Sequence, residues 1–382
     1  MRASALLALA AFLSTASALY RGFNYLPTFT NLTSKGLPDF QDEFTAARNL
    51  IGTSGFTSAR LYTMIQGGTI NSPTTAIQAA INTNTTLLLG ISASSGQDKI
   101  KSELTALESA VSQYESAFTS LIIGVSVGCE DLYRNSPAGV QNNAGSGAEP
   151  SDIVDYIGQV RSALSAAGIS TPVGHVDTWN AWVNSSNDEV IKNCDFIGMD
   201  SYPYFESDLD NSIQNANSTF WDSYQSTVRV AGSKPVWITE MSWPLSGATV
   251  GQAVASVVNA QFFWRQVACV AFDQVNTWWF TFHDVDPVTP HTSFGVVGYP
   301  VSNKPLFNLS CNGTIPKLLS SSGGPSRTST SSTATSKTHS HPTSTGRATF
   351  QSSTPTPTGN SAISIQFEGM ILYAMAGIMA FL

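Results

Sequence analysis

The sequence predicts an α/β fold of the (β/α)8 or TIM barrel type, followed by a disordered Ser/Thr-rich stalk. Eight short apolar runs bounded by turn residues alternate with segments of helical periodicity between residues 19 and 319. The runs are apolar throughout, as expected of parallel strands that are buried on both faces. Beyond residue 319 the composition changes abruptly to serine and threonine.

In chain order, the expected strands are residues 22–25, 58–62, 86–91, 121–127, 172–176, 196–200, 235–239 and 277–282. The expected helices are residues 40–51, 73–82, 100–118, 151–167, 212–231 and 253–268. Ser151 and Gly168 are typical N-cap and C-cap residues for the fourth helix. Eight such units suit a barrel, for which about 250 residues is typical. A doubly wound open sheet is the alternative, but the first strand lacks the Gly-rich phosphate turn usual in that fold.

Both ends of the chain resemble processing signals. An apolar run at residues 3–13 follows Arg2, and Ala16-Ser17-Ala18 is a small-x-small site, so residues 1–18 are expected to be a signal peptide. Residues 370–382 carry no charge and are too short to span a bilayer comfortably. With the small residues just upstream, they predict a removed GPI-attachment signal at 359–382, with attachment at Asn360. A buried N-terminal helix and an ordinary tail anchor are the alternatives.

Residues 320–358 contain 23 Ser or Thr among 39 residues and no acidic residue. Such a segment cannot bury enough apolar surface to fold, so we expect an O-glycosylated stalk. The stalk carries a charge of +3, which leaves the rest of the chain near −11 and argues against nucleic-acid binding. Six sequons predict N-glycosylation at Asn31, Asn84, Asn184, Asn217, Asn308 and Asn312. We therefore expect a secreted protein, GPI-anchored on the extracellular face of the cell membrane and present in the cell wall.

Two glutamates directly follow apolar strands. Glu130 follows the run 121–129, which contains the fourth predicted strand, and Glu240 follows the seventh predicted strand. In a (β/α)8 barrel, the chemistry lies at the carboxyl ends of the strands. A glutamate in this position is costly to bury unless it is paired or solvated. Two of them facing each other across the barrel mouth are what glycoside hydrolysis requires. The alternative is that each forms a structural salt bridge at the rim.

Aromatic residues gather just after the same strand ends, where their flat faces could stack on sugar rings. They are Tyr25, Tyr62, Trp179, Trp182, Tyr202, Tyr204, Trp243, Trp278 and Trp279. Within the barrel mouth, the side chains expected to bind substrate are Tyr25, Tyr62, Asp177, Tyr202 and Trp243. One of the adjacent pair Trp278 and Trp279 is expected to belong to the core.

The strand-end motifs resemble those of glycoside hydrolase family 17. They are RGFNY at 21–25, TSARLY at 57–62, GVSVGCEDLYR at 124–134, GHVDTW at 174–179, MDSYPY at 199–204 and WITEMSWP at 237–244. The resemblance spans nearly all of residues 20–311 and is greatest to the fungal, GPI-anchored glucan endo-1,3-β-glucosidases of that family. It implies retaining endo-hydrolysis of β-1,3-glucan, with Glu130 as proton donor and Glu240 as nucleophile. A retaining mechanism places the two carboxyl groups about 5–5.5 Å apart.

Two positions depart from the family pattern. The residue before the acid is commonly Asn, whose amide can bind a sugar, but here it is Cys129, a much weaker hydrogen-bonding group. Met241-Ser242 follow the nucleophile where the family often has Thr-Gly or similar small residues, while Trp243-Pro244 are kept. Neither change removes a carboxylate, so the departures concern subsite detail and rate.

The four cysteines of the mature chain allow three pairings. Cys129 lies at the carboxyl end of the fourth strand and Cys194 just before the sixth, so these two are expected at opposite ends of the barrel. We therefore predict a disulfide between Cys269 and Cys311, which leaves Cys129 and Cys194 as thiols. No His/Cys group has zinc-ligand spacing, so no metal or other cofactor is expected.

Three functions remain compatible with the sequence. The first is endo-hydrolysis of β-1,3-glucan, with a role in cell-wall organisation and polysaccharide breakdown. The second is a β-1,3-glucanosyltransferase, in which a sugar hydroxyl replaces water in the second step. The third is an inactive structural glycoprotein of the wall, which the retention of both carboxylates disfavours. The expected partners are the glucan and, through the anchor, the membrane; the protein is expected to be a monomer that binds no nucleic acid.

Overall fold

The computed structural model describes residues 19–285 and 290–311. The signal segment 1–18, the stalk 320–358, the C-terminal signal 359–382, Asn312 and Asn360 lie outside the described residues. Among the described residues, no helix is long and apolar enough to cross a membrane.

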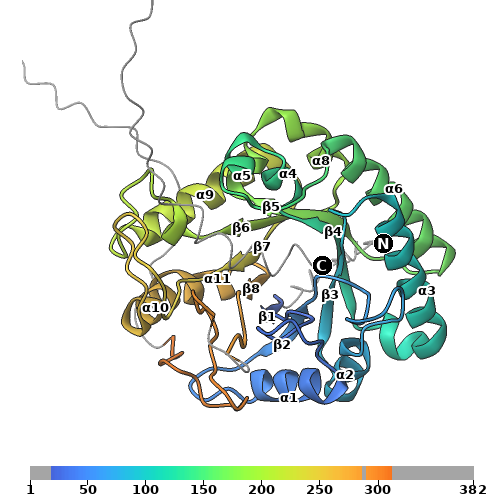
Figure 1. Cartoon of the computed structure of the whole chain (residues 1–382), viewed down its shortest axis with the longest axis horizontal. Coiled ribbons are helices and arrows are strands. Elements are labelled where there is room, and N and C mark those ends of the chain that lie inside the picture. Colours follow the sequence, from blue (N-terminus) through green and yellow to red (C-terminus); the bar gives the residue numbers. More distant parts are fainter. Residues whose placement is uncertain (1–18, 286–289, 312–382) are drawn as a thin grey trace, which may run out of the picture. The chain divides into compact units, whose positions relative to one another are not determined.

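Eight parallel strands close into a barrel in chain order, with helices around the outside (Figure 1). They are β1 (Arg21–Asn24), β2 (Phe56–Arg60), β3 (Thr86–Ile91), β4 (Ile122–Cys129), β5 (Val173–Thr178), β6 (Ile197–Ser201), β7 (Val236–Met241) and β8 (Thr277–Trp279). The last strand pairs with the first, with Arg21 opposite Thr277. The predicted (β/α)8 barrel is thus confirmed and the open sheet excluded.

The six predicted helices correspond to α1 (Leu37–Arg48), α2 (Ala76–Thr83), α3 (Gln97–Thr119), α6 (Pro150–Ala166), α9 (Ala216–Ala231) and α10 (Val257–Phe263). Helix α6 starts one residue earlier than expected, with Glu149 and not Ser151 as its N-cap. Helix α10 continues through a π-helical turn (Trp264–Ala268) into α11 (Cys269–Phe272). Four shorter helices were not predicted: α4 (Asp131–Arg134), α5 (Pro137–Gln141), α7 (Trp179–Trp182) and α8 (Asp188–Asn193). Segments of four to six residues are too short to show a helical period, which needs about 11 residues.

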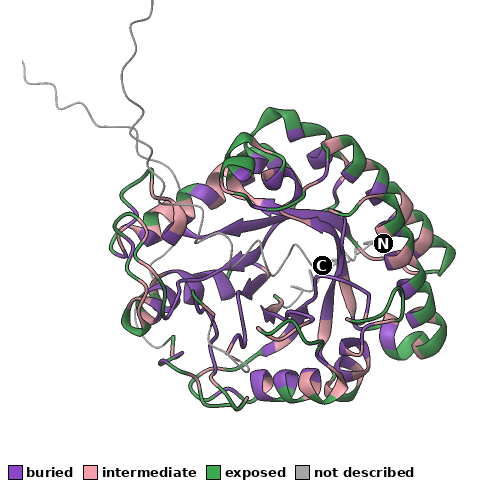
Figure 2. Cartoon of the chain, in the orientation of Figure 1, coloured by how far each residue is buried: buried purple, intermediate pink, exposed green. Residues whose placement is uncertain are grey.

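The barrel strands are buried along almost their whole length, while the helices expose their outer faces (Figure 2). One buried cluster brings together side chains from different positions around the barrel: Leu88, Phe196, Trp237 and Trp278. Trp237 stacks on Phe196 with ring centroids 3.9 Å apart. Since Leu88 on β3 and Trp237 on β7 are not on neighbouring strands, their contact fills the barrel interior. Both Trp278 and Trp279 are fully buried, although the sequence predicts only one of them in the core.

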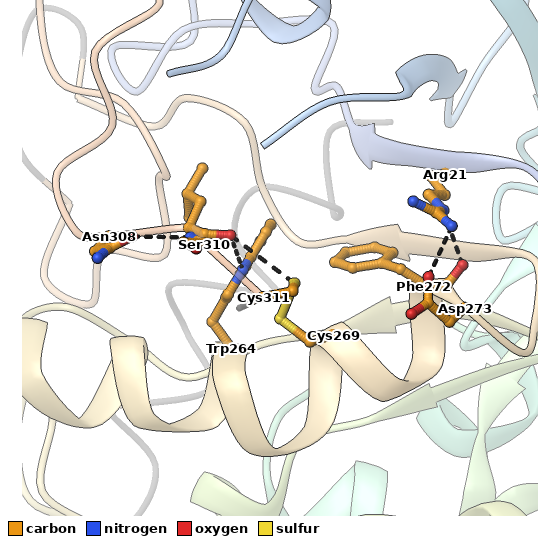
Figure 3. The surroundings of a disulfide bond; sticks show 9 residues. Arg21, Trp264, Cys269, Phe272, Asp273, Asn308, Ser310 and Cys311 are labelled. Carbon is orange, nitrogen blue, oxygen red and sulfur yellow. Dashed lines mark hydrogen bonds and ion pairs between the residues drawn. A yellow bond between two sulfur atoms is a disulfide. The ribbon is translucent and has the colours of Figure 1, made fainter. Parts of the chain in front are cut away.

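A disulfide joins Cys269 in α11 to Cys311, the pair expected from the sequence, with the two Cα atoms 5.6 Å apart (Figure 3). The Trp264 indole N–H donates to the Leu309 carbonyl at 2.9 Å and ties the same segment to the helix. Closing a loop with a sequence separation of 42 residues stabilises the fold by about 4 kcal/mol in the chain-entropy description. Cys129 ends β4 and Cys194 precedes β6, and both are thiols.

Four of the predicted glycosylation sites are exposed on the barrel surface. These are Asn31, Asn84, Asn184 and Asn308. Asn217 lies in the first turn of α9, where its residue is half-buried and its side-chain oxygen is enclosed. A glycan needs an accessible amide, so Asn217 is the least suitable acceptor of the five described sequons.

Candidate active site

Glu240 stands at the centre of the candidate site. It lies near the end of β7, directly across the sheet register from Asp200 on β6, and is fully buried. Its Oε1 accepts from the Arg60 guanidinium at 2.5 Å and from the Tyr62 hydroxyl at 2.7 Å. Its Oε2 accepts from the Tyr202 hydroxyl at 2.5 Å. Both oxygens are therefore held by donors from β2 and β6, or from residues just beyond those strands.

Arg60 is a buried cation that several acceptors surround. Besides Glu240, its guanidinium donates to the Asn24 side-chain oxygen at 2.7 Å and to the Cys129 sulfur at 3.2 Å. It also lies over the Tyr62 ring, 4.5 Å from the centroid. A buried charge is tolerated only when it is paired and hydrogen-bonded. Arg60 therefore compensates the charge of Glu240 and holds its carboxylate in place.

A second acidic side chain, Asp200, lies opposite Glu240 on the neighbouring strand. Its Oδ1 accepts from the Thr239 hydroxyl at 2.6 Å. Burial and the negative charge of Glu240 raise the pKa of Asp200 well above its usual value. The Cys129 sulfur is 3.9 Å from both an Asp200 and a Glu240 oxygen. These three groups could in principle hold a metal ion, but the Arg60 cation already lies against the same sulfur and would repel one.

Glu130 directly follows β4 and has a left-handed backbone conformation, with φ of 57°. Its backbone N–H donates to the Val176 carbonyl at 2.9 Å, and its side chain is half-buried. Burial, and after it the negative charge of Glu240, raises the pKa of Glu130 to about 8, against the opposing charge of Arg134. A carboxyl group with such a pKa is protonated at neutral pH and can donate a proton.

The raised pKa of Glu130 predicts a pH-dependent loss of stability. Because the folded state keeps this proton up to about pH 8, while an unfolded glutamate loses it near pH 4.5, folding becomes less favourable as pH rises through this window. Glu130→Gln has no ionisable group at this position, so it does not lose stability in this way. It should unfold like the wild type at pH 4 and be more stable by roughly 1–3 kcal/mol at pH 8, allowing for solvent screening.

Thermal or urea unfolding at the two pH values measures this difference. Glu189 is exposed and pairs with Lys192, so Glu189→Gln is a suitable control and should follow the wild type at both pH values. A Glu130→Gln variant whose stability relative to the wild type is the same at pH 4 and pH 8 would contradict the raised pKa.

Of the side chains expected to bind substrate, Tyr62 and Tyr202 lie at the site. Besides bonding Glu240, they belong to an apolar cluster at the barrel mouth with Leu26, Phe280 and Phe294. This cluster borders the sulfur of Cys129 and lowers the polarity around the carboxylates. Both rings are 6–7% exposed, so their hydroxyls are aimed at Glu240 and not at bulk water.

Tyr25 and Trp243 have a different position from the one expected. The Tyr25 ring packs edge-on against Phe44 of α1, with centroids 4.7 Å apart, and belongs to the main core cluster. Trp243 is fully buried, packs edge-on against Tyr204 and donates its indole N–H to the Val254 carbonyl at 3.0 Å. These contacts make both rings part of the core, which corrects the expectation that they bind substrate.

Asp177 also departs from its expected role. It is fully buried, and its carboxylate accepts backbone N–H groups of Leu132, Tyr133 and Thr178 at 2.8, 3.2 and 2.8 Å. A carboxylate occupied in this way has little capacity left for a sugar hydroxyl. The expectation that Asp177 binds substrate is therefore corrected to a role in holding the backbone after β4.

Sequence reasoning assigned no role to Arg60 or Asp200, although Arg60 lies within the predicted strand 58–62 and Asp200 ends the predicted strand 196–200. The signal was present, because each is a charged residue within or directly after an apolar run. Such a residue must find a partner of opposite charge or a proton once it is buried. Arg60 finds Glu240, and Asp200 has a raised pKa.

In this closed (β/α)8 barrel, a half-buried glutamate with a raised pKa interacts electrostatically with a buried, hydrogen-bonded glutamate. These are the two carboxyl groups that glycoside hydrolysis requires. The BtgE/BtgC glycoside hydrolase domain model matches residues 22–299, and the chain belongs to this family. It is thus a glycoside hydrolase by family.

Curated relatives agree with that placement, and a solved structure has a similar fold. The chain is 53% identical over 324 residues to a probable glucan endo-1,3-β-glucosidase eglC of Aspergillus oryzae, covering 84% of this chain and 70% of the relative. The Aspergillus fumigatus protein of the same name is 52% identical over 313 residues, covering 82% and 70%. A glycoside hydrolase family 17 β-1,3-glucanosyltransferase from Rhizomucor miehei has a similar fold, with a TM-score of 0.61 and 23% identity over 76% of this chain and 97% of that one.

Proposed function

We propose that this protein is a glucan endo-1,3-β-glucosidase that cleaves internal linkages of β-1,3-glucan with retention of anomeric configuration. The observation that carries the proposal is the pairing of Glu130, whose pKa is raised, with Glu240, whose two oxygens are held by three donors. The identity of 50–53% to relatives named as glucan endo-1,3-β-glucosidases supports the choice of substrate.

In the proposed first step, Glu240 attacks the anomeric carbon while Glu130 gives its proton to the departing glycosidic oxygen. The bond from the anomeric carbon to that oxygen breaks, and a covalent glycosyl-enzyme forms on Glu240. In the second step Glu130, now ionised, removes a proton from water, which attacks the same carbon and releases Glu240. The Arg60, Tyr62 and Tyr202 donors hold the Glu240 carboxylate in one orientation before the attack.

The structure offers a reason why Glu130 can play both parts. Before the first step, the negative charge of Glu240 favours the protonated form of Glu130. Once Glu240 is esterified by the sugar that charge is gone, so Glu130 becomes a stronger acid and stays ionised as the base. Glu130 thus alternates between acid and base as the charge of Glu240 is lost and regained.

Incubation of the purified protein with β-1,3-linked glucose oligosaccharides, followed by separation of the products over time, tests the proposal. We expect shorter oligosaccharides from internal cleavage, with the new reducing end first formed as the β-anomer and visible by proton NMR. Products longer than the starting oligosaccharide would instead indicate glucanosyl transfer. An initial α-anomer would refute the retaining mechanism, and an absence of products would favour a structural role in the wall.

We further propose that the protein is secreted and GPI-anchored at Asn360, on the extracellular face of the membrane and in the cell wall. The N-terminal apolar segment, the hydroxyl-rich segment 320–358 and the small residues near Asn360 support this proposal. Release from intact cells by a phosphatidylinositol-specific phospholipase C is the expected result. If the protein stays on the cells after phospholipase treatment and is released only by detergent, a tail anchor would be indicated instead.

A further inference from the structure

The turn that carries Glu130 has an uncommon backbone conformation. Gly128 has φ of 86° and Glu130 has φ of 57°, both in the left-handed region. A Cβ atom at position 128 would lie 2.2 Å from an Asp131 carboxylate oxygen, so only glycine fits there. A residue such as glutamate persists in this region when the surrounding structure holds it there. The contacts that hold this turn therefore decide where the Glu130 carboxyl lies.

The backbone after Glu130 is bound by Asp177 of β5. Its Oδ2 accepts from Leu132 N–H and its Oδ1 from Tyr133 N–H, the amides two and three residues beyond Glu130. His175 in turn holds Asp177. One ring nitrogen lies 3.0 Å from Asp177 Oδ2 and the other 2.5 Å from the Val127 carbonyl oxygen. Since both nitrogens face oxygen acceptors, the geometry suits an imidazolium, which compensates the buried Asp177 charge.

The backbone before Glu130 is bound by a second buried carboxylate. Asp131 Oδ2 accepts from the Cys129 N–H at 2.7 Å, and Asp131 Oδ1 accepts from the Ser94 hydroxyl at 2.5 Å. Glu130 thus lies between two stretches of backbone that are each fixed by a carboxylate. Asp131 belongs to the turn itself, whereas Asp177 comes from the neighbouring strand and fixes the turn to the barrel.

We propose that Asp177 is a positioning residue for the proton donor: it holds Glu130 in place by binding the backbone amides that follow it. The inference rests on the proposed function of Glu130 and adds to it a residue that acts without touching substrate. Glu130 lies on a short turn just beyond β4, where its own N–H is the last to bond the backbone of β5, at the Val176 carbonyl. Asp177, the next residue of β5, binds the two amides beyond this point and so fixes the turn on the far side of Glu130.

Charge gives Asp177 a second effect on the same group. Among the groups that act on Glu130, Glu240 and Asp177 raise its pKa, and Arg134 and Arg60 lower it. Asp200, Cys129 and Tyr133 also interact with it electrostatically. Loss of the Asp177 charge should therefore make Glu130 a stronger acid. The pH above which the enzyme loses its proton donor should then move down.

Asp177→Asn tests the proposal with two substrates that differ in their need for the proton. A β-1,3-linked glucose hexasaccharide has a poor leaving group, so its cleavage depends on Glu130. In a 2,4-dinitrophenyl glycoside of the β-1,3-linked disaccharide, the leaving group is 2,4-dinitrophenolate, which departs without needing a proton. We expect kcat/KM, which reports the first step, to fall about 10²-fold for the hexasaccharide and less than about 3-fold for the aryl glycoside. The alkaline limb of the hexasaccharide profile should move to lower pH.

Asp177→Glu separates position from charge and serves if Asp177→Asn fails to fold. It keeps the charge but displaces the carboxylate by one methylene, so the hexasaccharide rate should fall while the alkaline limb stays. Asp195→Asn is the matched control, because Asp195 accepts the Val173 amide at 2.9 Å at the other end of β5. It should leave both substrates and the pH profile unchanged.

The outcomes separate this inference from the proposed function. Equal losses on both substrates in folded variants, or no loss on either, would overturn the positioning role. A wild-type protein that cleaves neither substrate would instead overturn the proposed function. A wild type active on both substrates, with Asp177→Asn unaffected, would leave the proposed function intact and refute this inference alone.

Discussion

Replacement of Glu240 by Gln is expected to lower the rate of β-1,3-glucan cleavage by about 10⁴- to 10⁶-fold, because the amide cannot form the glycosyl ester. Gln has nearly the same shape and can still accept from the Tyr62 and Arg60 donors, so the barrel should remain folded. The loss is measured from the initial rate of product formation, with circular dichroism to verify the fold. Glutamine at this position with a rate within tenfold of wild type would exclude Glu240 as nucleophile.

A matched control uses another fully buried glutamate. Glu103 on α3 accepts from the Thr63 hydroxyl and the Met64 amide and has no hydrogen bond to Glu240 or Arg60. Glu103→Gln should lose some stability but keep most of its activity. This comparison separates the loss of a nucleophile from the loss of any buried carboxylate.

Azide distinguishes the role of Glu240 from that of Glu130. In Glu240→Ala, azide can enter the vacated space and attack the anomeric carbon of a dinitrophenyl glycoside. The carbon–nitrogen bond forms as the bond to the aryl oxygen breaks, which gives the α-glycosyl azide. In Glu130→Ala, azide would instead intercept the glycosyl-enzyme and give the β-azide. If Glu240→Ala gave the β-azide and Glu130→Ala the α-azide, the proposed roles of the two glutamates would be reversed.

The second large effect is expected for Arg60→Met. Methionine fills part of the same space but leaves Glu240, Asp200 and the Cys129 thiol without their shared cation. Removal of one member of a buried ion pair typically costs 3–5 kcal/mol, and loss of a donor to a reacting group costs about 10²–10³ in kcat. We expect both, measured by chemical unfolding and by initial rates. A variant as stable as the wild type would show that the buried pair contributes nothing.

Two further variants make the Arg60 result specific. Arg161 pairs with Asp195 on the surface, where both side chains are more than a third exposed, so Arg161→Met should cost less than about 1 kcal/mol. In Arg60→Met/Glu240→Gln both charges are removed, and the destabilisation should be smaller than the sum of the single losses by about 1–3 kcal/mol. Simple additivity would mean that the two groups do not interact in solution.

Part of this architecture follows from local patterns in the chain. Runs in which every residue is apolar indicate strands that are buried on both faces. Because such runs are separated by helical segments, they predict a parallel barrel. Glu130 and Glu240 could be singled out because a charged residue at the end of such a run needs a special environment. The Cys269–Cys311 bond followed from the expected ends of the strands. These conclusions need only local patterns and the order of the segments along the chain.

The contacts around the glutamates depend instead on strands that are far apart in the chain. Arg60 and Glu240 are 180 residues apart, and Asp177 binds amides 44 and 45 residues before it. Sequence patterns report which face of a strand is buried, but not which side chain from another strand lies against it. For that reason Tyr25 and Trp243 looked like sugar platforms although core residues cover them, and Asp177 looked like a substrate ligand although backbone amides occupy it. The sequence by itself determined the barrel and the positions of its two glutamates. Only closure of the barrel decided which side chains bind Glu240 and which charges shift the pKa of Glu130.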